Sequence, residues 1–216
     1  MTDVVIVGAG GHAAEIAEYI SYAQKADAES ELRLVGLIDD DPDSYAGYQF
    51  GAPYLGTIAA HQVRNDVQYV IGIANLKYRK EIVEKLLSEG AQFASVIHPN
   101  TYVSPSSSLG TGVVIGPNAN VGPNVTVGNF NLLNARCSLG HDTKIGDYNF
   151  ISPNVCMSGF TVVGDNNLFG INAATVPGIK IGDNNKIAAG MVLNKDVGDD
   201  EVVFFRHKEK VIAIPK

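Results

Sequence analysis

Residues 115–128 read IGPNANVGPNVTVG, and this stretch decides the fold of the second half of the chain. Three aliphatic residues, Ile115, Val121 and Val127, stand six positions apart, and a glycine follows each of them. A fixed short period is typical of a stacked solenoid, in which each repeat packs only against its neighbours. Six residues supply one short strand and one corner, so three repeats predict a triangular coil of about 18 residues.

The same period extends in both directions from this stretch, with no slip of register expected between residues 103 and 198. We expect each anchor side chain to point into the prism and the following glycine to permit a tight corner. About five coils would then stack at roughly 4.8 Å per layer. Sixteen anchor positions follow this spacing, with one polar exception at Thr175: Val103, Leu109, Ile115, Val121, Val127, Leu133, Leu139, Ile145, Ile151, Met157, Val163, Phe169, Thr175, Ile181, Ile187 and Leu193.

Residues before about Pro99 show a different pattern, in which strand-like and helix-like segments alternate. This order predicts a small Rossmann-like parallel α/β layer. The expected strands are 4–7, 34–38, 69–73 and 93–97, and the expected helices are 11–23 and 77–88. The sequence therefore predicts an α/β domain at 1–99, an all-β solenoid at 100–198 and a C-terminal tail at 199–216.

Composition limits the class of function. The net charge of −7 and a pI of about 5.1 argue against a nucleic-acid-binding protein, while leaving room for a small anionic ligand. No stretch approaches the roughly 18 apolar residues of a membrane span, and the N-terminus has the pattern of a strand rather than a signal peptide. We therefore expect a cytoplasmic protein without membrane partners. The two cysteines indicate small buried side chains, and no metal cluster is visible.

The N-terminal domain carries a phosphate-binding pattern. Residues 8–13 read GAGGHA, which fits GxGxxG/A directly after a strand and at the start of a helix. Gly10, Gly11 and His12 would face a phosphate, and Asp39 or Asp40 would bind the ribose. A nucleotide sugar, a redox dinucleotide and a turn that has lost its ligand are all compatible with this pattern.

A second segment of the same domain is expected to complete the nucleotide site. Residues 71–75 read IGIAN at the carboxyl end of a later strand, where ligands of parallel sheets gather, so Gly72 and Asn75 are candidate contacts. Arg79 follows one helical turn later. Its side chain is either a ligand contact or part of a solvated helix face.

His141 is the candidate catalytic residue of the solenoid. It is the third residue of its repeat, which places it at a corner of the prism. A neutral imidazole at a corner can accept a proton from an attacking amine or hydroxyl, and Asp142 can orient the ring. The alternative is a surface histidine in a permissive turn.

Taken together, these motifs resemble the hexapeptide-repeat, left-handed β-helix acyltransferases. Within them, the chain is similar to the bacterial nucleotide-sugar N-acetyltransferases of the bacillosamine and perosamine pathways, and to relatives named after sialic acid O-acetylation. The similarity covers residues 3 to about 197. It is carried by residues 8–12 (GAGGH), 71–75 (IGIAN), 96–99 (VIHP), 140–142 (GHD) and 170–172 (GIN).

The resemblance implies roles for particular residues. His141 would be the catalytic base with Asp142 as its partner, and Asn134 would hold the sugar. The acetyl-CoA groove would include Gly159, Ile171, Ala189 and Gly190, and the chain would form a homotrimer with its active sites between subunits.

The spacing of these residues agrees with a corner location. The differences of 18 between His141 and Gly159, and between Ile171 and Ala189, stack each pair on one corner. A pantetheine arm running along stacked corners would then meet these residues in order.

The sequence departs from the family pattern at two places. Phe150 stands where some relatives carry a second histidine. Residues 204–210 replace the usual Gly-x-Pro-Ala turn, and there Arg206, Lys208 and Lys210 would either meet CoA phosphates or form an ordinary basic tail.

The expected reaction transfers an acetyl group from acetyl-CoA to the 4-amino group of a nucleotide-linked 4-amino-4,6-dideoxy sugar, directly within a ternary complex. The alternatives are an O-acetyltransferase acting on sialic acid or another sugar hydroxyl, a dinucleotide-dependent oxidoreductase, and a non-catalytic nucleotide-binding solenoid. The sequence leaves open whether the nucleotide is UDP, dTDP or GDP.

Overall fold

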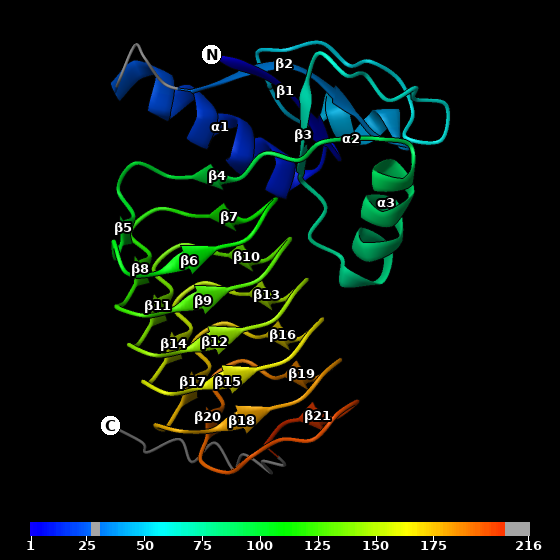
Figure 1. The fold of residues 1–216 in the computed structure, drawn as a ribbon. Helices are drawn as coiled ribbons and strands as arrows, with labels where there is room; N and C mark the ends of the chain where they lie inside the picture. The colour runs from blue at the N-terminus through cyan, green and yellow to red at the C-terminus, as the bar shows by residue number, and fades with distance from the viewer. Residues whose placement is uncertain (27–30, 206–216) are drawn as a thin grey trace, which may run out of the picture.

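A computed structural model describes residues 1–26 and 31–205, so Arg206, Lys208 and Lys210 lie outside the described residues. The N-terminal part is a three-stranded parallel sheet of order β2-β1-β3 with helices beside it (Figure 1). Its elements are β1 (Thr2–Val7), α1 (Gly11–Ala26), β2 (Leu32–Ile38), α2 (Pro42–Ala46), β3 (Gln68–Ile71) and α3 (Leu76–Ser88). The expected small α/β domain is confirmed.

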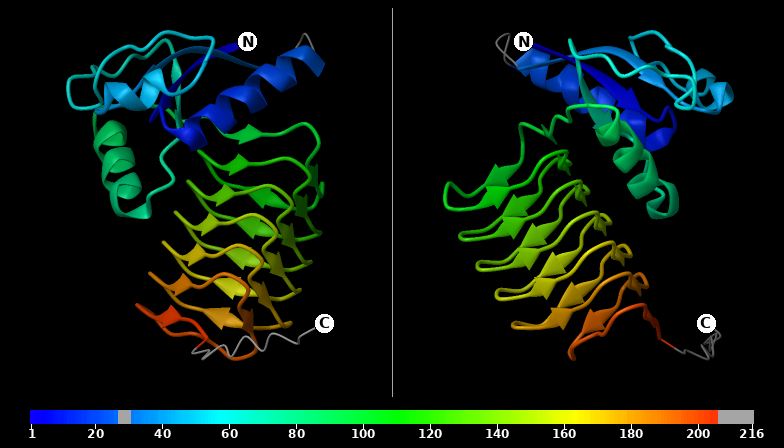
Figure 2. Two further views of the ribbon diagram at one scale, coloured as in Figure 1. Left: turned by 180° about the vertical axis from the view of Figure 1, so that it is seen from behind. Right: turned by 45° about the vertical axis from the view of Figure 1, so that its right-hand side comes forward.

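The rest of the described chain is a stack of triangular coils whose strands form three parallel sheets (Figures 1 and 2). Sheet I contains β4 (Val96–Ile97), β7 (Val114–Ile115), β10 (Leu132–Leu133), β13 (Phe150–Ile151), β16 (Leu168–Phe169), β19 (Lys186–Ile187) and β21 (Val202–Val203). Sheet II contains β5 (Tyr102–Val103), β8 (Asn120–Val121), β11 (Ser138–Leu139), β14 (Cys156–Met157), β17 (Ala174–Thr175) and β20 (Val192–Leu193). Sheet III contains β6 (Ser108–Leu109), β9 (Thr126–Val127), β12 (Lys144–Ile145), β15 (Val162–Val163) and β18 (Lys180–Ile181).

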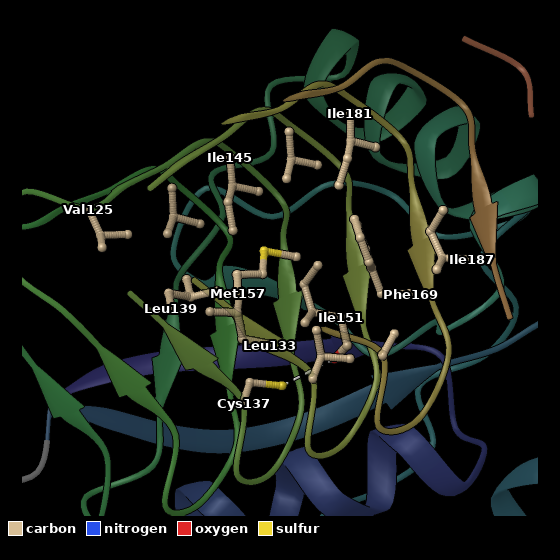
Figure 3. Packing of buried hydrophobic residues seen from close by; sticks show 14 of the residues in the cluster. Val125, Leu133, Cys137, Leu139, Ile145, Ile151, Met157, Phe169, Ile181 and Ile187 are labelled. Carbon is tan, nitrogen blue, oxygen red and sulfur yellow. Dashed lines mark hydrogen bonds between the residues drawn. The ribbon is translucent and has the colours of Figure 1, made fainter. Parts of the chain in front are cut away.

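The anchor side chains fill the interior of the prism, as the period predicts (Figure 3). Leu133, Leu139 and Ile151 are fully buried there. The polar exception, Thr175, is also buried, and its hydroxyl accepts a hydrogen bond from the Ser158 amide at 3.0 Å. Because that hydroxyl is hydrogen-bonded, a threonine is tolerated inside an apolar core.

The structure corrects the role expected for the repeated glycines. None of the glycines that follow an anchor has a positive φ angle; the left-handed residue stands two positions later, as in Asp142 (φ 58°). The glycines are required instead by the close approach of successive coils. A Cβ atom on Gly128 would lie 2.6 Å from the Gly146 carbonyl oxygen, and one on Gly170 would lie 2.5 Å from the Ala189 amide nitrogen.

The solenoid is also longer than predicted. Its 18 strands, β4 to β21, make six turns rather than about five. β4 pairs with β7, so it belongs to sheet I and not to the N-terminal layer in which a strand at 93–97 was expected; only Phe93 bridges to Tyr69 there. The prediction of an unbroken register was wrong for the final coil. There Ile181 pairs with Val197, so paired residues are 16 rather than 18 positions apart.

Sheet I joins the two parts of the chain. The outward-facing side chains of Val114 and Leu132 are buried in one cluster with residues of α1. Phe130 is buried with Val83 and Leu86 of α3 in a second cluster. Helices α1 and α3 therefore lie against the upper coils (Figures 1 and 2), and the nucleotide-type turn at the start of α1 faces the solenoid.

Candidate active site

The glycine turn after β1 borders a cavity that collects most of the predicted nucleotide contacts. The turn is shaped by Gly8, whose φ of 104° suits only glycine, and by hydrogen bonds from Gly8 to Ile38 and from Gly72 to Val7. The cavity has a volume of about 240 Å³. The predicted residues that line it are Gly10, Gly11, His12, Asp39, Gly72 and Asn75.

Asp39 and Asp40 differ in what their carboxylates do. Both oxygens of Asp39 accept backbone hydrogen bonds, from Ala9 at 2.6 Å and from Asp41 at 2.9 Å, so this side chain holds the glycine turn to the end of β2. Asp40 accepts a bond from the Ala59 amide at 2.9 Å and lines an adjoining cavity of about 420 Å³. Asp39 lines both cavities, whereas Asp40 lines the adjoining cavity and not the nucleotide cavity.

His12 connects the nucleotide cavity to a second cavity between the two domains. This second cavity, called the sugar pocket below, has a volume of about 540 Å³ and includes the predicted residue Asn134 from the solenoid. The Nδ1 atom of His12 lies 3.2 Å from Glu15, while its Nε2 atom is buried without a partner among the described residues. An unpaired buried nitrogen of this kind is available to a ligand.

Several residues of the sugar pocket were not predicted as contacts. They are Glu15, Glu18, Tyr48, Phe150 and Pro153. Glu15 follows His12 by three residues on an expected helix, so both side chains lie on one face. Glu15 could therefore have been predicted from the sequence as a neighbour of His12. Tyr48 lies in a stretch without periodicity, and only the tertiary structure brings its hydroxyl next to Gly11.

His141 lies at the corner between sheets II and III, where its side chain is 57% exposed. Its Nδ1 atom is 2.8 Å from the Asp142 carboxylate, which also accepts a hydrogen bond from Asn124 one coil above. The hydrogen bond with His141 is the main cause that lowers the pKa of Asp142, and the bond from Asn124 adds to it. The ring of Phe160 packs edge-on against the imidazole at 5.1 Å. The structure thus forms the predicted His–Asp pair and fixes the ring orientation.

Gly159 lies directly beneath the imidazole. A Cβ atom at this position would be 2.8 Å from both Cε1 and Nε2 of His141. The imidazole therefore occupies space that is free only because residue 159 has no side chain.

The other predicted acetyl-CoA residues occupy a different corner. Ile171 and Ala189 stack at the corner between sheets I and II, where the Gly190 amide donates to the Ile171 carbonyl at 2.8 Å. Each predicted pair therefore stacks on one corner, as its spacing of 18 indicates, but the two pairs occupy different corners with sheet II between them. The six residues that lead from one corner to the next within a coil span up to about 20 Å.

Cys137 points into the prism core, where burial raises the pKa of its thiol to about 12 (Figure 3). A thiol with such a pKa is a poor nucleophile at neutral pH. In residues 1–26 and 31–205, no group of three or more His, Cys, Asp or Glu side chains is placed to hold a metal ion.

Arg79 is buried, with 1% of its surface exposed, so the solvated helix face is excluded. Within the same described ranges, none of the helices combines the length and apolarity that a membrane crossing requires.

Family models match three parts of the chain. Residues 3–86 match the PglD N-terminal domain, residues 94–129 match the bacterial transferase hexapeptide with six repeats, and residues 161–195 match the hexapeptide repeat of succinyl-transferase. A curated relative, UDP-N-acetylbacillosamine N-acetyltransferase of Bacillus subtilis (strain 168), is 32% identical over 116 residues. That match spans 53% of this chain and about half, 51%, of the relative.

Solved structures resemble almost the whole chain. The acetyltransferase domain of PglB from Neisseria gonorrhoeae FA1090 in complex with acetyl coenzyme A has a TM-score of 0.81 and 25% identity, over 93% of this chain and 94% of that one. PerB from Caulobacter crescentus, in complex with CoA and GDP-perosamine, has a TM-score of 0.82 and 24% identity, over 94% and 93% of the two chains. The fold is the left-handed parallel β-helix of such acetyltransferases with a small α/β domain at its N-terminus.

Proposed function

Because this chain joins a PglD N-terminal domain to bacterial transferase hexapeptide repeats, we propose that it is an acetyl-CoA-dependent sugar N-acetyltransferase. Its acceptor is the 4-amino group of a nucleotide-linked 4-amino-4,6-dideoxy sugar. The proposal draws on the named activity of the curated relative and on the acetyl coenzyme A of the similar PglB domain.

One observation carries the choice of an amine acceptor: the charge of the sugar pocket. Glu15 and Glu18 line the pocket, and among residues 1–26 and 31–205 no lysine or arginine lines it. Carboxylates favour a substrate that arrives as an ammonium ion and disfavour one that carries its own carboxylate. An amino sugar fits this pocket better than sialic acid, so N-acetylation is preferred over the O-acetylation alternative.

The nucleotide and the sugar would occupy adjoining cavities. The nucleotide cavity and the sugar pocket share Gly11, His12 and Ala74, so a linear molecule passes from one to the other beside the imidazole of His12. The start of α1 places backbone N–H groups and the positive end of a helix at this junction, which suits a diphosphate.

In the proposed mechanism, His141 acts as the general base. The bound ammonium first loses one proton to solvent, and the neutral amine then attacks the thioester carbonyl. His141 accepts the second proton, which the nitrogen loses as the tetrahedral intermediate forms or collapses. The thiolate of CoA leaves, and a backbone N–H group stabilises the oxyanion. The ionised Asp142 holds the ring and stabilises the imidazolium.

The two halves of the site would meet only between subunits. The sugar pocket contains Asn134 and Pro153, which adjoin the corner between sheets I and II, whereas His141 stands at the next corner. A homotrimer of parallel prisms would bring the His141 corner of one subunit to the sugar pocket of its neighbour, with acetyl-CoA between Gly159 and Ile171. A cytoplasmic location stays a prediction.

The test is a thiol-release assay with acetyl-CoA and a panel of UDP-, dTDP- and GDP-linked 4-amino sugars. We expect turnover with at least one of these sugars and none with sialic acid. Acetylation of sialic acid with no turnover of the amino sugars would favour the O-acetyltransferase. If NAD(H) binds and no acetyl-CoA is consumed, the oxidoreductase would replace the proposal.

Substituting Gly159 tests whether the space beneath His141 matters. Gly159→Ala is expected to lower kcat about 10- to 100-fold, because the new Cβ atom would displace the imidazole from its reacting position. Pro177→Ala, one coil below at the same corner, is the matched control and should leave kcat unchanged. Full activity of Gly159→Ala with an unchanged melting temperature would contradict this role.

A further inference from the structure

A groove of about 590 Å³ lies between the first turn of α3 and the lower coils of sheet I. On one side it is lined by Asn75 and Lys77, and on the other by Asn166, Asn184 and Lys186. Within the part of the chain that the structure describes, no acidic residue lines it. This inter-domain groove shares Ala74 and Phe150 with the sugar pocket but extends away from it.

The groove is electropositive although the chain has a net charge of −7. Lys77 and Lys186 stand on opposite walls, and neither forms an ion pair within residues 1–26 and 31–205. The positive end of the α3 dipole adds to their charge, because Asn75 is the N-cap of this 13-residue helix. Two lysines without an ion pair in the described residues and a helix start therefore surround one cavity, and the Lys77 ammonium lies 5.1 Å from the centroid of the Tyr78 ring.

A third cation lies behind the wall of the groove. Arg79 follows Asn75 by one turn and is 1% exposed, and its Nε, Nη1 and Nη2 atoms have no hydrogen-bond partner within residues 1–26 and 31–205. Arg79 does not itself line the groove, and its guanidinium interacts electrostatically with Tyr148 of the solenoid. Burial lowers the pKa of Arg79 to about 10, which reflects a charge without an anion.

The groove also offers a free acceptor. The Nδ2 atom of Asn166 donates to Asn184 at 2.9 Å, while its Oδ1 atom is buried without a partner among the described residues. A ligand that matches this wall carries an anionic group for the lysines and a hydroxyl or N–H donor for the amide oxygen.

From these observations we propose that the inter-domain groove is a second ligand site, which binds the phosphate group of a nucleotide or sugar phosphate. The phosphate lies between Lys77 and Lys186 at the start of α3, and a hydroxyl of the same molecule donates to Asn166. The groove adjoins the nucleotide cavity, with which it shares Ala74 and Asn75, but Lys77, Asn166 and Lys186 line the groove and not that cavity. The proposal stands whether or not the chain transfers acetyl groups.

Calorimetric titration of the full chain tests the proposal with three probes, adenosine 3′,5′-diphosphate, GDP and UDP. The Lys77→Ala/Lys186→Ala variant is expected to bind at least one probe about tenfold more weakly than the unchanged chain. The matched control is Lys144→Ala/Lys180→Ala, which removes two lysines at the same repeat position in sheet III. This control should bind all three probes with unchanged affinity.

The choice of probes separates the possible sources of the phosphate. Weaker binding of adenosine 3′,5′-diphosphate alone identifies the phosphate end of CoA, and weaker binding of GDP or UDP alone identifies the nucleotide of the nucleotide-linked sugar. Equal affinities of the groove variant and the unchanged chain for all three probes would overturn the proposal.

Arg79→Met gives a second, independent readout. Methionine has a similar volume and no charge, so without a probe the melting temperature should not fall, while binding of the affected probe should weaken. A lower melting temperature with unchanged binding would show that Arg79 serves packing alone and would remove it from the site.

Discussion

Replacing His141 with alanine is expected to lower kcat for sugar acetylation by about 10²- to 10⁴-fold, the usual contribution of a general base. The side chain is 57% exposed at a corner, so its loss should leave the fold and the melting temperature unchanged. The KM for acetyl-CoA should change little, because the ring acts on the amine rather than on the pantetheine. Steady-state kinetics with the best sugar of the nucleotide panel measures both constants.

Two companion variants sharpen this result. Asp142→Asn keeps a hydrogen-bonding side chain but removes the carboxylate that orients the ring, and we expect it to lose about tenfold or more in kcat. Lys144→Ala, on the neighbouring strand of the same coil, is the control and should retain full activity. If kcat of His141→Ala stays within a few-fold of the unchanged enzyme, the amine binds already deprotonated and His141 is not the base.

Mixing two inactive variants is expected to restore activity if His141 serves the sugar pocket of a neighbouring subunit. One variant is His141→Ala, and the other is His12→Ala/Asn134→Ala, which damages the pocket but keeps the base. In a cyclic trimer that contains both variants, about one third of the sites combine an intact pocket with an intact His141. Co-expression with two different affinity tags and purification over both gives the mixed oligomers, whose kcat is then measured.

The outcome separates catalysis between subunits from catalysis within one chain. If His141 acted within its own chain, every site of the mixed oligomer would lack either the base or the pocket, and activity would stay at the level of the single variants. Doubly tagged His141→Ala oligomers provide the background. Light scattering on the same samples establishes the oligomeric state on which this prediction depends.

The sequence determined the solenoid because its period is a local property. Every sixth side chain must point into the prism, so buried anchors such as Leu139 and Ile151 were predictable from spacing alone. The same reasoning failed for the last coil, which is two residues shorter near Val197. This shortening depends on how strands pair across coils, and the residue types at this point do not reveal it.

The reason for the repeated glycines was visible only in three dimensions. From the sequence we attributed them to tight corners, but the contact of a Cβ atom on Gly128 with the next coil depends on the distance between layers. Only the tertiary structure shows that Arg79 is buried and unpaired among the described residues, because α3 packs its inner face against Phe130 and Tyr148 of the solenoid.

The candidate site divides in the same way. Motifs that lie within a few residues, the glycine turn at 8–13 and the His141–Asp142 pair, were determined by the sequence, because their geometry is set by local backbone conformation. Only the tertiary structure decided that His12 and Asn134, 122 positions apart, line one pocket, and that a whole sheet separates this pocket from His141. The physical reason is that the six-residue spacing determines which face of the prism a residue occupies. The residues that it contacts are determined by how the α/β domain packs onto sheet I.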